Sequence, residues 1–193
     1  MKLPKEFYLQ PDVITIAKNL LGKVLVTKLD GQLTSGIICE TEAYNGVVDK
    51  ASHAYGGRRT ARTETMYAEG GVAYIYLCYG IHHLFNVVTN VKDIPHAVLI
   101  RGIQPLEGIP QILERKKISQ LKKNMGIGPG NVSTCLGLRT SQDKTSLLGN
   151  QVWIEDRDIK IITQQIIAGP RVGVDYAGED AKLPYRFQYR FDE

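Results

Sequence analysis

Two carboxylates and a tyrosine stand close together in the stretch ICETEAY at residues 38–44. The apolar residues at its start predict a β-strand, and successive side chains of a strand point to opposite faces. Glu40, Glu42 and Tyr44 would then share one face. A carboxylate that is shielded from water can accept a proton from a reacting water molecule. The pattern predicts a general-base site, and the alternation of faces does not choose between the two acids.

Two other interpretations of these acids stay open at this point. Half-buried strands often end in solvated polar residues, so Glu40 and Glu42 could be exposed or paired with arginines. A sugar glycosidase uses two carboxylates, but these must lie at a defined separation across the substrate. Two acids on one strand do not establish that separation.

A second group of residues has types that suit nucleic-acid binding. The stretch VAYIYLCYG at residues 72–80 carries Tyr74 and Tyr76 on one face of an expected strand, and Tyr79 lies beside Gly80 at the expected turn. Aromatic rings can stack on bases, and a bulky side chain at a hairpin tip can wedge between base pairs. Alternatively, Tyr74 and Tyr76 are core residues and Tyr79 packs over the sheet edge.

Basic residues precede this stretch in a segment with little periodicity. Residues 45–71 contain two glycine pairs and the tightest arginine cluster of the chain, Arg58, Arg59 and Arg62. A connection of this length is typical of a functional loop, and its arginines could neutralise phosphates. A solvated basic loop is the alternative. The four histidines are not spaced as pairs of metal ligands, so we expect no metal site. They are His53, His82, His83 and His96.

The elements that position these residues are predicted from hydrophobic periodicity. The first half favours a helix at residues 12–21, strands at 23–29 and 33–44 joined by a tight turn, a hairpin of 72–79 with 81–90, and a strand at 96–104. The second half favours a basic helical segment between residues 106 and 123, a short helix from the Gly-Pro-Gly loop at 128–130 to residue 138, and strands at 152–155, 159–163 and 185–191. This order predicts an α+β fold.

The composition is that of an ordinary globular protein. The chain has 193 residues, of which 43% are hydrophobic and 23% charged, and this suits a single domain of residues 1–193 with a sizeable core. A net charge of +4 permits a polyanionic partner without requiring one. The sequence offers no run for a signal peptide or membrane span, and its three cysteines are widely spaced. We therefore expect a cytoplasmic protein.

Several motifs, taken in order, resemble the alkyladenine (3-methyladenine) DNA glycosylase family in its short bacterial form. They are ETEAY at 40–44, His53 followed by GGRRTAR, YIYLCYG with Asn86 downstream, LIRGIQPLEG at 99–108, GPGN at 128–131 and GPRVGVDYAGEDAKLPYRF at 169–187. A single motif of this kind is weak, but the ordered series covers most of the chain. The resemblance implies a single compact domain with a curved, mostly antiparallel β-sheet, peripheral helices and a protruding hairpin that inserts into DNA.

The resemblance also implies an activity. The family excises damaged purines from duplex DNA without a metal or another cofactor. Glu42 would activate a water molecule, and Arg101 would hold the water and the carboxylate in place. No lysine occupies a nucleophile position in the matched motifs, so the expected product is an abasic site without strand cleavage. The expected partner is double-stranded DNA that contains 3-methyladenine, 7-methylguanine, hypoxanthine or ethenoadenine, and the expected state is a monomer without membrane contact, active at the nucleoid.

Each residue of the base pocket is assigned by its place in the family motifs. The extruded purine would lie between Tyr44 and Tyr76, with His53 against its edge. Asn86 would crowd the exocyclic amine of normal guanine. Alkylated purines are often cationic, so aromatic faces would favour them. A competing hypothesis is a non-catalytic protein that binds damaged or single-stranded DNA with the same tyrosines.

The remaining assignments concern the DNA backbone and the vacated base stack. Tyr79 would fill the gap left by the extruded base, with Ile81 and His82 beside it in the minor groove. The phosphates would be bound by the basic cluster, Arg58, Arg59 and Arg62. Two positions depart from the family pattern: Asn131 stands where a lysine is common, and His82 stands where an aromatic residue is common.

Overall fold

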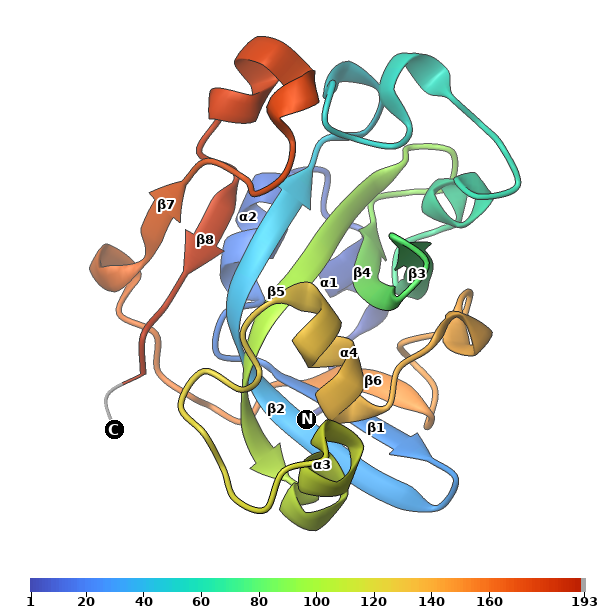
Figure 1. Ribbon diagram of the computed structural model, residues 1–193. Coiled ribbons are helices and arrows are strands. Elements are labelled where there is room, and N and C mark those ends of the chain that lie inside the picture. The colour runs from blue at the N-terminus through green and yellow to red at the C-terminus, as the bar shows by residue number, and fades with distance from the viewer. Residues whose placement is uncertain (192–193) are drawn as a thin grey trace.

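The fold is described for residues 1–191 of a computed structural model, shown in Figure 1. Its helices are α1 (Lys5–Tyr8), α2 (Val13–Asn19), α3 (Ile109–Lys116) and α4 (Pro129–Leu136). Its strands are β1 (Val24–Leu29), β2 (Gln32–Tyr44), β3 (Val72–Cys78), β4 (His82–Thr89), β5 (His96–Glu107), β6 (Val152–Glu155), β7 (Ile167–Gly169) and β8 (Arg186–Gln188).

The strands join one curled antiparallel sheet, visible in Figure 1. The main order is β3-β4-β5-β2-β1-β6, and β8 pairs with both β2 and β7. The long strand β2 makes this possible, because its first half pairs with β1, its end pairs with β8, and most of its length pairs with β5. The curled sheet with peripheral helices confirms the predicted α+β fold.

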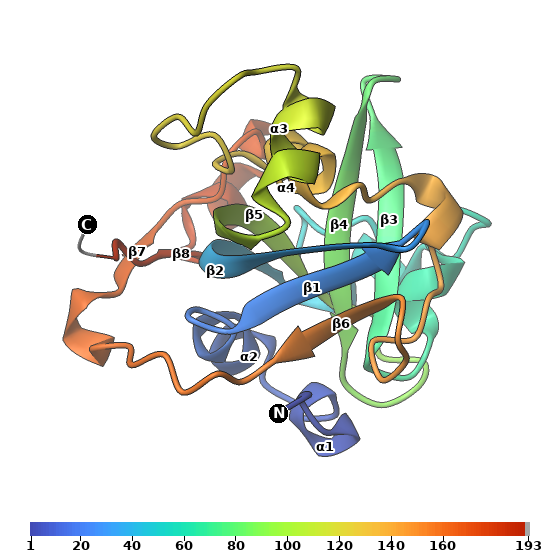
Figure 2. The same ribbon diagram turned by 90° about the horizontal axis from the view of Figure 1, so that it is seen from below.

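Helices cover both sides of this sheet. Figure 2 shows α1 and α2 on one side, and α3 and α4 on the other. Asp12 begins α2 as predicted, since its side chain accepts a hydrogen bond from a helix N–H at 2.9 Å. Buried threonines tie the helices to the sheet: Thr41 donates to the Ala17 carbonyl at 2.9 Å, and Thr27 donates to the Leu136 carbonyl at 2.8 Å.

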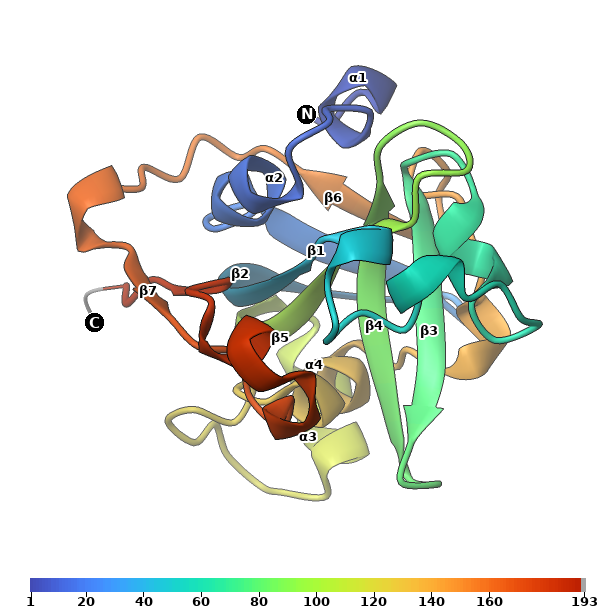
Figure 3. The same ribbon diagram turned by 90° about the horizontal axis from the view of Figure 1, so that it is seen from above.

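The hairpin of β3 and β4 projects from the body of the molecule, as Figures 2 and 3 show. Its turn runs from Cys78 to Ile81, whose N–H donates to the Cys78 carbonyl at 3.2 Å. Tyr79 and Gly80 at the turn centre have φ values of 51° and 73°. Positive φ at both central positions is the pattern of a type I′ turn, whose twist matches that of the flanking strands. The turn leaves Tyr79 at the tip, 91% exposed.

The predicted basic helical segment is wrong at both ends, because β5 continues through Glu107 and α3 ends at Lys116. Lys117 adopts a left-handed conformation with φ 53°, and its N–H donates to the Glu114 carbonyl. The N–H of Ile118 donates to the Leu113 carbonyl at 3.1 Å. These two bonds form a Schellman-type helix end, with lysine in the position where glycine is more usual. Residues 118–127 therefore form a loop, and the lysines within it do not share a helical face.

The late strands also differ from the prediction. Residues 159–163 form no strand, because Ile161 packs over Gly22 instead of joining a ladder: a Cβ on Gly22 would lie 2.7 Å from Ile161 Cγ1. The chain pairs later, where the unpredicted strand β7 meets β8. The expected strand at 185–191 shortens to Arg186–Gln188. The short helix α1 was not predicted either.

Candidate active site

A cavity of about 730 Å³ opens where the end of β2, the β3–β4 hairpin, the start of α4 and the loop after Arg171 meet. This volume is within the range of small-molecule sites, about 300–1,000 Å³. Most of the residues predicted for the site line it: Glu42, Tyr44, His53, Arg62, Tyr76, Tyr79, His82, Asn86 and Arg101. The structure thus brings together residues from distant parts of the sequence.

Glu42 is the most constrained side chain of this cavity. It is fully buried, and its Oε1 accepts a hydrogen bond from the Val172 N–H at 2.8 Å. Its Oε2 accepts from the Tyr44 hydroxyl at 2.8 Å. The Arg101 Nε lies 3.4 Å from Oε1. Two hydrogen-bond donors and one ion-pair partner, on three segments, therefore fix the carboxylate.

The protonation of Glu42 is set by opposing effects. Burial raises the pKa of its carboxyl above the ordinary value, and this effect outweighs the charge of Arg101 and the hydrogen bonds from Val172 and Tyr44. A carboxylate with a raised pKa is a stronger proton acceptor than one in water. The group therefore has the environment of a general base held in one orientation.

Arg101 reaches this carboxylate from an irregular part of the sheet. The pairing of β2 with β5 shifts register between Ile38 and Glu40, and again between Glu40 and Thr41. Cys39 is the extra residue in the first bulge, and Arg101 is the extra residue in the second. Bulges re-aim side chains, and here Arg101 turns toward both acids of β2.

Glu40 shares this arginine but has a different environment. Its Oε1 accepts from Arg101 Nε at 3.2 Å and from Arg186 Nε at 2.7 Å. Glu40 is absent from the lining of the cavity that contains Glu42, and it lies instead beside a second hollow next to Cys39. The two acids share one face of β2, as predicted, yet only Glu42 lines the cavity.

Three aromatic side chains form a wall of the cavity. The rings of His53 and Tyr76 meet edge to face with centroids 4.7 Å apart, and Tyr74 lies 5.4 Å from Tyr76. The Tyr74 hydroxyl is 3.0 Å from His53 Nδ1. Burial, helped by the charges of Arg62 and Arg58, lowers the pKa of His53 to about 4. The imidazole is therefore neutral at physiological pH.

Asn86 is held by its amide group. Its Nδ2 donates to the carbonyls of Tyr74 and Leu84 at 3.1 and 3.2 Å, so both amide protons are used. The side chain is buried and lines the cavity. Its shape is therefore a fixed part of the cavity wall.

A profile of the methylpurine-DNA glycosylase family matches residues 6–193. A protein of Chlamydia abortus is 51% identical over 187 residues, which cover 96% of each chain. This chain belongs to the methylpurine-DNA glycosylase family. Relatives from Bacillus cereus and Clostridium perfringens are 44% and 42% identical, over 98% and 97% of this chain and 96% and 95% of their own. All three relatives bear the name "Putative 3-methyladenine DNA glycosylase".

Membership confirms that the chain is a DNA glycosylase, a DNA-repair enzyme that acts on N-glycosyl bonds. DNA is therefore its substrate. None of the helices in residues 1–191 has the length and apolar composition needed to cross a membrane. The same residues hold no group of three or more His, Cys, Asp or Glu side chains placed to bind a metal ion.

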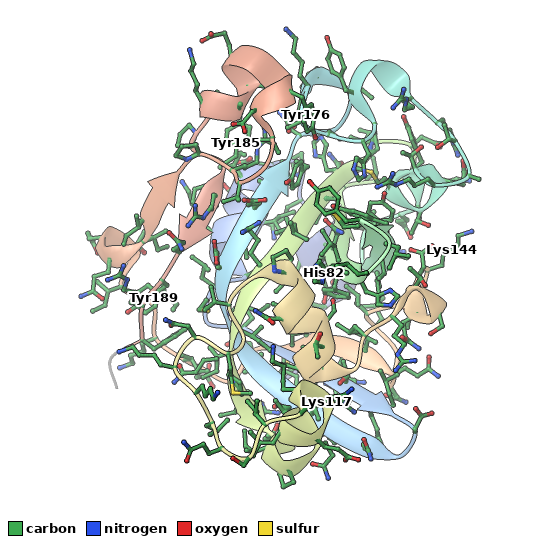
Figure 4. All side chains as sticks on the ribbon, viewed as in Figure 1. His82, Lys117, Lys144, Tyr176, Tyr185 and Tyr189 are labelled. Atoms are coloured by element: carbon green, nitrogen blue, oxygen red, sulfur yellow. The ribbon has the colours of Figure 1, made fainter. Side chains whose placement is uncertain are left out.

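The hairpin of the glycosylase presents apolar side chains at its tip. Tyr79 is 91% exposed, and Ile81 on the other side of Gly80 is 71% exposed. His82 lies against the start of α4, where a Cβ on Gly130 would come within 2.8 Å of His82 Nδ1; Figure 4 labels this histidine. The tip is therefore solvent-exposed, and its base is braced by α4.

The arginine cluster divides into side chains with different partners. Arg59 forms ion pairs with Glu64 and Asp93 at 2.7 and 2.8 Å. Arg58 is exposed. Arg62 lines the cavity, and its guanidinium lies 5.0 Å from the centroid of the Tyr76 ring. The structure thus places one arginine of the cluster at the cavity itself, which was not predicted.

A buried ion pair holds the loop that supports Glu42. Arg171 donates from its two terminal nitrogens to Asp49 at 2.5 and 2.8 Å, and from one of them to the Ala43 carbonyl at 2.9 Å. Its guanidinium also lies 4.8 and 5.3 Å from the rings of Tyr44 and Tyr185. Because Val172 follows directly, this pair fixes the backbone N–H that Glu42 accepts. The pair was not predicted, since the motif GPRVG contains no acidic partner for the arginine.

Two further tyrosines belong to the site although no role was predicted for them. Tyr74, expected in the core, is 2% exposed, and its bond with His53 makes it part of the cavity wall. Tyr176 is 71% exposed at the cavity rim, where its hydroxyl donates to the Ala51 carbonyl at 3.1 Å. Figure 4 shows Tyr176 between its own segment and the loop that follows β2. The bond links the two loops at the cavity mouth.

Proposed function

We propose that this glycosylase extrudes damaged purines from duplex DNA and hydrolyses their N-glycosidic bond with a water molecule activated by Glu42. The observation that carries the proposal is the environment of Glu42. Its carboxylate is buried in the cavity and fixed by Val172, Tyr44 and Arg101, and its pKa is raised by burial. A protein that only binds DNA has no use for an acid at this position, and the negative charge of the acid would repel the DNA phosphates.

Base extrusion is supported by the hairpin. A base must leave the stack before its glycosidic bond can be attacked, at a cost of a few kcal/mol. Tyr79 would enter the vacated space, since it is 91% exposed and stands at the centre of the two-residue turn. Ile81 and His82 would contact the minor groove beside it. An inserted ring slows the return of the base by blocking its place in the stack.

The extruded purine would enter the aromatic cavity. Tyr44 and Tyr76 would contact its faces, and neutral His53 would contact its edge. Asn86 would exclude the exocyclic amine of guanine, because both of its amide protons are already bound and its position cannot adjust. Arg58, which is exposed near the cavity, would contact a phosphate.

Hydrolysis replaces the bond from C1′ to the base nitrogen with a bond from C1′ to a water oxygen. As the bond from C1′ to the base nitrogen breaks, its electron pair leaves with the base and the sugar becomes cationic. The water oxygen bonds to C1′, and Glu42 accepts one water proton. That proton passes to solvent or to the released base. The negative charge of the Glu42 carboxylate also stabilises the cationic sugar, and Arg101 keeps this carboxylate in place.

The expected product is an abasic site without strand cleavage. A glycosylase that also cleaves the strand needs an amine to form a covalent intermediate with the sugar. Within residues 1–191, the side chains that line the cavity include no lysine. Water is therefore the nucleophile that the site can supply.

The test is an excision assay with separate duplexes that contain hypoxanthine, ethenoadenine, 7-methylguanine or 3-methyladenine. Alkali treatment converts abasic sites to strand breaks, and omission of alkali reports any lyase activity. We expect alkali-dependent breaks with the wild-type protein and none above background with Glu42→Gln. Lesion binding by both proteins without excision by either would contradict the proposal and support a non-catalytic binder.

A further inference from the structure

Arg62 occupies an unusual position for a member of a basic surface cluster. Its guanidinium lies over the ring of Tyr76, 5.0 Å from the centroid, and both side chains line the cavity. A cation over an aromatic ring is attracted by the negative face of the ring. The Tyr76 ring therefore already has a cationic partner within the protein.

The charge of Arg62 has no carboxylate to balance it. Within residues 1–191, no Asp or Glu side chain forms an ion pair with Arg62, whereas Arg59 pairs with both Glu64 and Asp93. The two arginines belong to one sequence cluster, but only Arg59 is neutralised. Arg62 thus carries its charge unpaired at the cavity.

The acids around the cavity are balanced by arginines. Glu42 and Glu40 are neutralised by Arg101 and Arg186, two acids against two arginines. The nearby Asp49 is paired with Arg171. His53 is uncharged at neutral pH because its pKa is lowered to about 4, and the charge of Arg62 contributes to that lowering. Two arginines near His53, Arg58 and Arg62, form no ion pair with any Asp or Glu among residues 1–191, and of the two only Arg62 lines the cavity.

We propose that Arg62 selects the bases that this glycosylase excises according to their charge, and that it favours neutral damaged purines over cationic ones. This inference rests on the proposed function, because it concerns the purine that Tyr76 would contact. The substrate class it names is that of deaminated or etheno-bridged purines. Purines with an alkylated ring nitrogen and a full positive charge are the disfavoured class.

Three physical effects act in the same direction. A cationic base would lose the benefit of the Tyr76 ring, because the guanidinium already provides the cation for that ring. It would also be repelled by the like charge of Arg62, which is exposed and unpaired at the cavity. A neutral purine develops negative charge as it leaves with the bonding electrons, and a guanidinium that donates hydrogen bonds to its ring or carbonyl atoms stabilises that charge. Arg62 therefore hinders one class of base and assists the other.

The experiment compares excision of cationic 7-methylguanine with excision of neutral hypoxanthine and ethenoadenine, each in the same duplex sequence. Wild-type protein, Arg62→Gln and Arg62→Lys are measured under single-turnover conditions, from limiting to saturating protein. We expect Arg62→Gln to raise the ratio of 7-methylguanine to hypoxanthine excision by at least about 2-fold and up to about 30-fold, the range of a cation–π contact. Arg62→Lys keeps the charge, so its ratio should stay nearer the wild-type value.

Arg59→Gln is the matched control, because it removes a neighbouring arginine whose charge is already balanced. It should change the excision of all three lesions by a common factor. An unchanged ratio in Arg62→Gln would overturn the inference. So would an equal loss on all lesions with a weaker dependence on salt, which would make Arg62 a phosphate contact. Failure of the wild-type protein to excise any lesion would instead remove the proposed function itself.

Discussion

The two acids at the end of β2 have the same chemistry and different surroundings. Glu40 and Glu42 are both buried, share one face of the strand and contact the same arginine, Arg101. Glu40 also binds Arg186 and is absent from the cavity lining, whereas Glu42 lines the cavity and accepts bonds from Val172 and Tyr44. The partners of a carboxylate, more than its residue type or burial, therefore separate a structural acid from a candidate catalytic one.

The bulges around Glu40 produce this difference. Ile38 belongs to the main core, but Glu40, two residues further on, faces away from it. Cys39 is the extra residue that changes the face, and the compensating bulge at Arg101 restores the pairing. The arginine is thereby placed between the acids.

Replacement of Glu42 by Gln should have the largest effect. The amide keeps the shape of the side chain but cannot accept a water proton, so excision should fall by about 10²–10⁴-fold, the range of a lost general base. Single-turnover rates on a hypoxanthine duplex measure this. Lesion binding, measured by fluorescence anisotropy, should be retained, and a variant that loses binding to the same extent as excision would argue for a structural role.

Replacement of Arg101 by Ala should lower excision by about 10²-fold, because the fixed charge that holds the Glu42 carboxylate is lost. The pKa of Glu42 should also rise further, since the Arg101 charge opposes the effect of burial. Arg101→Lys retains the charge and should recover part of the rate. Turnover of Arg101→Ala near the wild-type value would show that Arg101 serves the sheet and Glu40 alone.

The pH dependence of excision should report the raised pKa of Glu42. The pKa of Glu42 is raised by burial, so its proton-accepting form is lost as the pH falls through a value above the ordinary carboxyl range. Tyr44→Phe removes a hydrogen bond that favours the ionised form, so the acid limb of the excision profile should move to higher pH. The rate at neutral pH should fall by about 10-fold, near the lower end of the roughly 1.5–3 kcal/mol that a hydrogen bond to a charged group is worth, because Val172 and Arg101 still hold the carboxylate. A limb that does not move would contradict the assignment.

Replacement of Glu40 by Gln should affect stability more than excision. Its carboxylate binds two partly buried arginines, so the loss should lower the free energy of unfolding by about 1–3 kcal/mol. Urea denaturation measures this. Excision by the folded variant should stay within about 10-fold of wild type, because Arg101 keeps Glu42 as a partner. A rate loss as large as that of Glu42→Gln would favour the alternative in which both acids act on the sugar.

Much of this arrangement could be predicted from the sequence. Alternation of side chains correctly placed Glu40, Glu42 and Tyr44 on one face, and glycine in YLCYG correctly marked the hairpin turn with Tyr79 at its tip. These are local properties, because strand alternation and turn conformation depend on neighbouring residues. The choice of Glu42 over Glu40 came from the family motif and stays a prediction.

Long-range features could not be predicted in this way. The bulges at Cys39 and Arg101 exist only when β2 meets β5, and the Val172 N–H that binds Glu42 is a backbone group that any residue carries. The contact of Arg62 with Tyr76 likewise depends on how the loop after β2 folds back over the hairpin. The wrongly extended basic helix had a local cause, since lysine is an uncommon residue for the left-handed helix end at Lys117.

The most direct test of the central claim, that Glu42 and not Glu40 activates the water, is the ratio of two rates on one substrate. Single-turnover excision of hypoxanthine is measured side by side for Glu40→Gln and Glu42→Gln, with circular dichroism to show that both variants are folded. We predict that Glu40→Gln excises hypoxanthine at least about 10-fold faster than Glu42→Gln, because general-base catalysis is kept in the first variant and lost in the second. Equal rates, or a slower Glu40→Gln, would contradict the account.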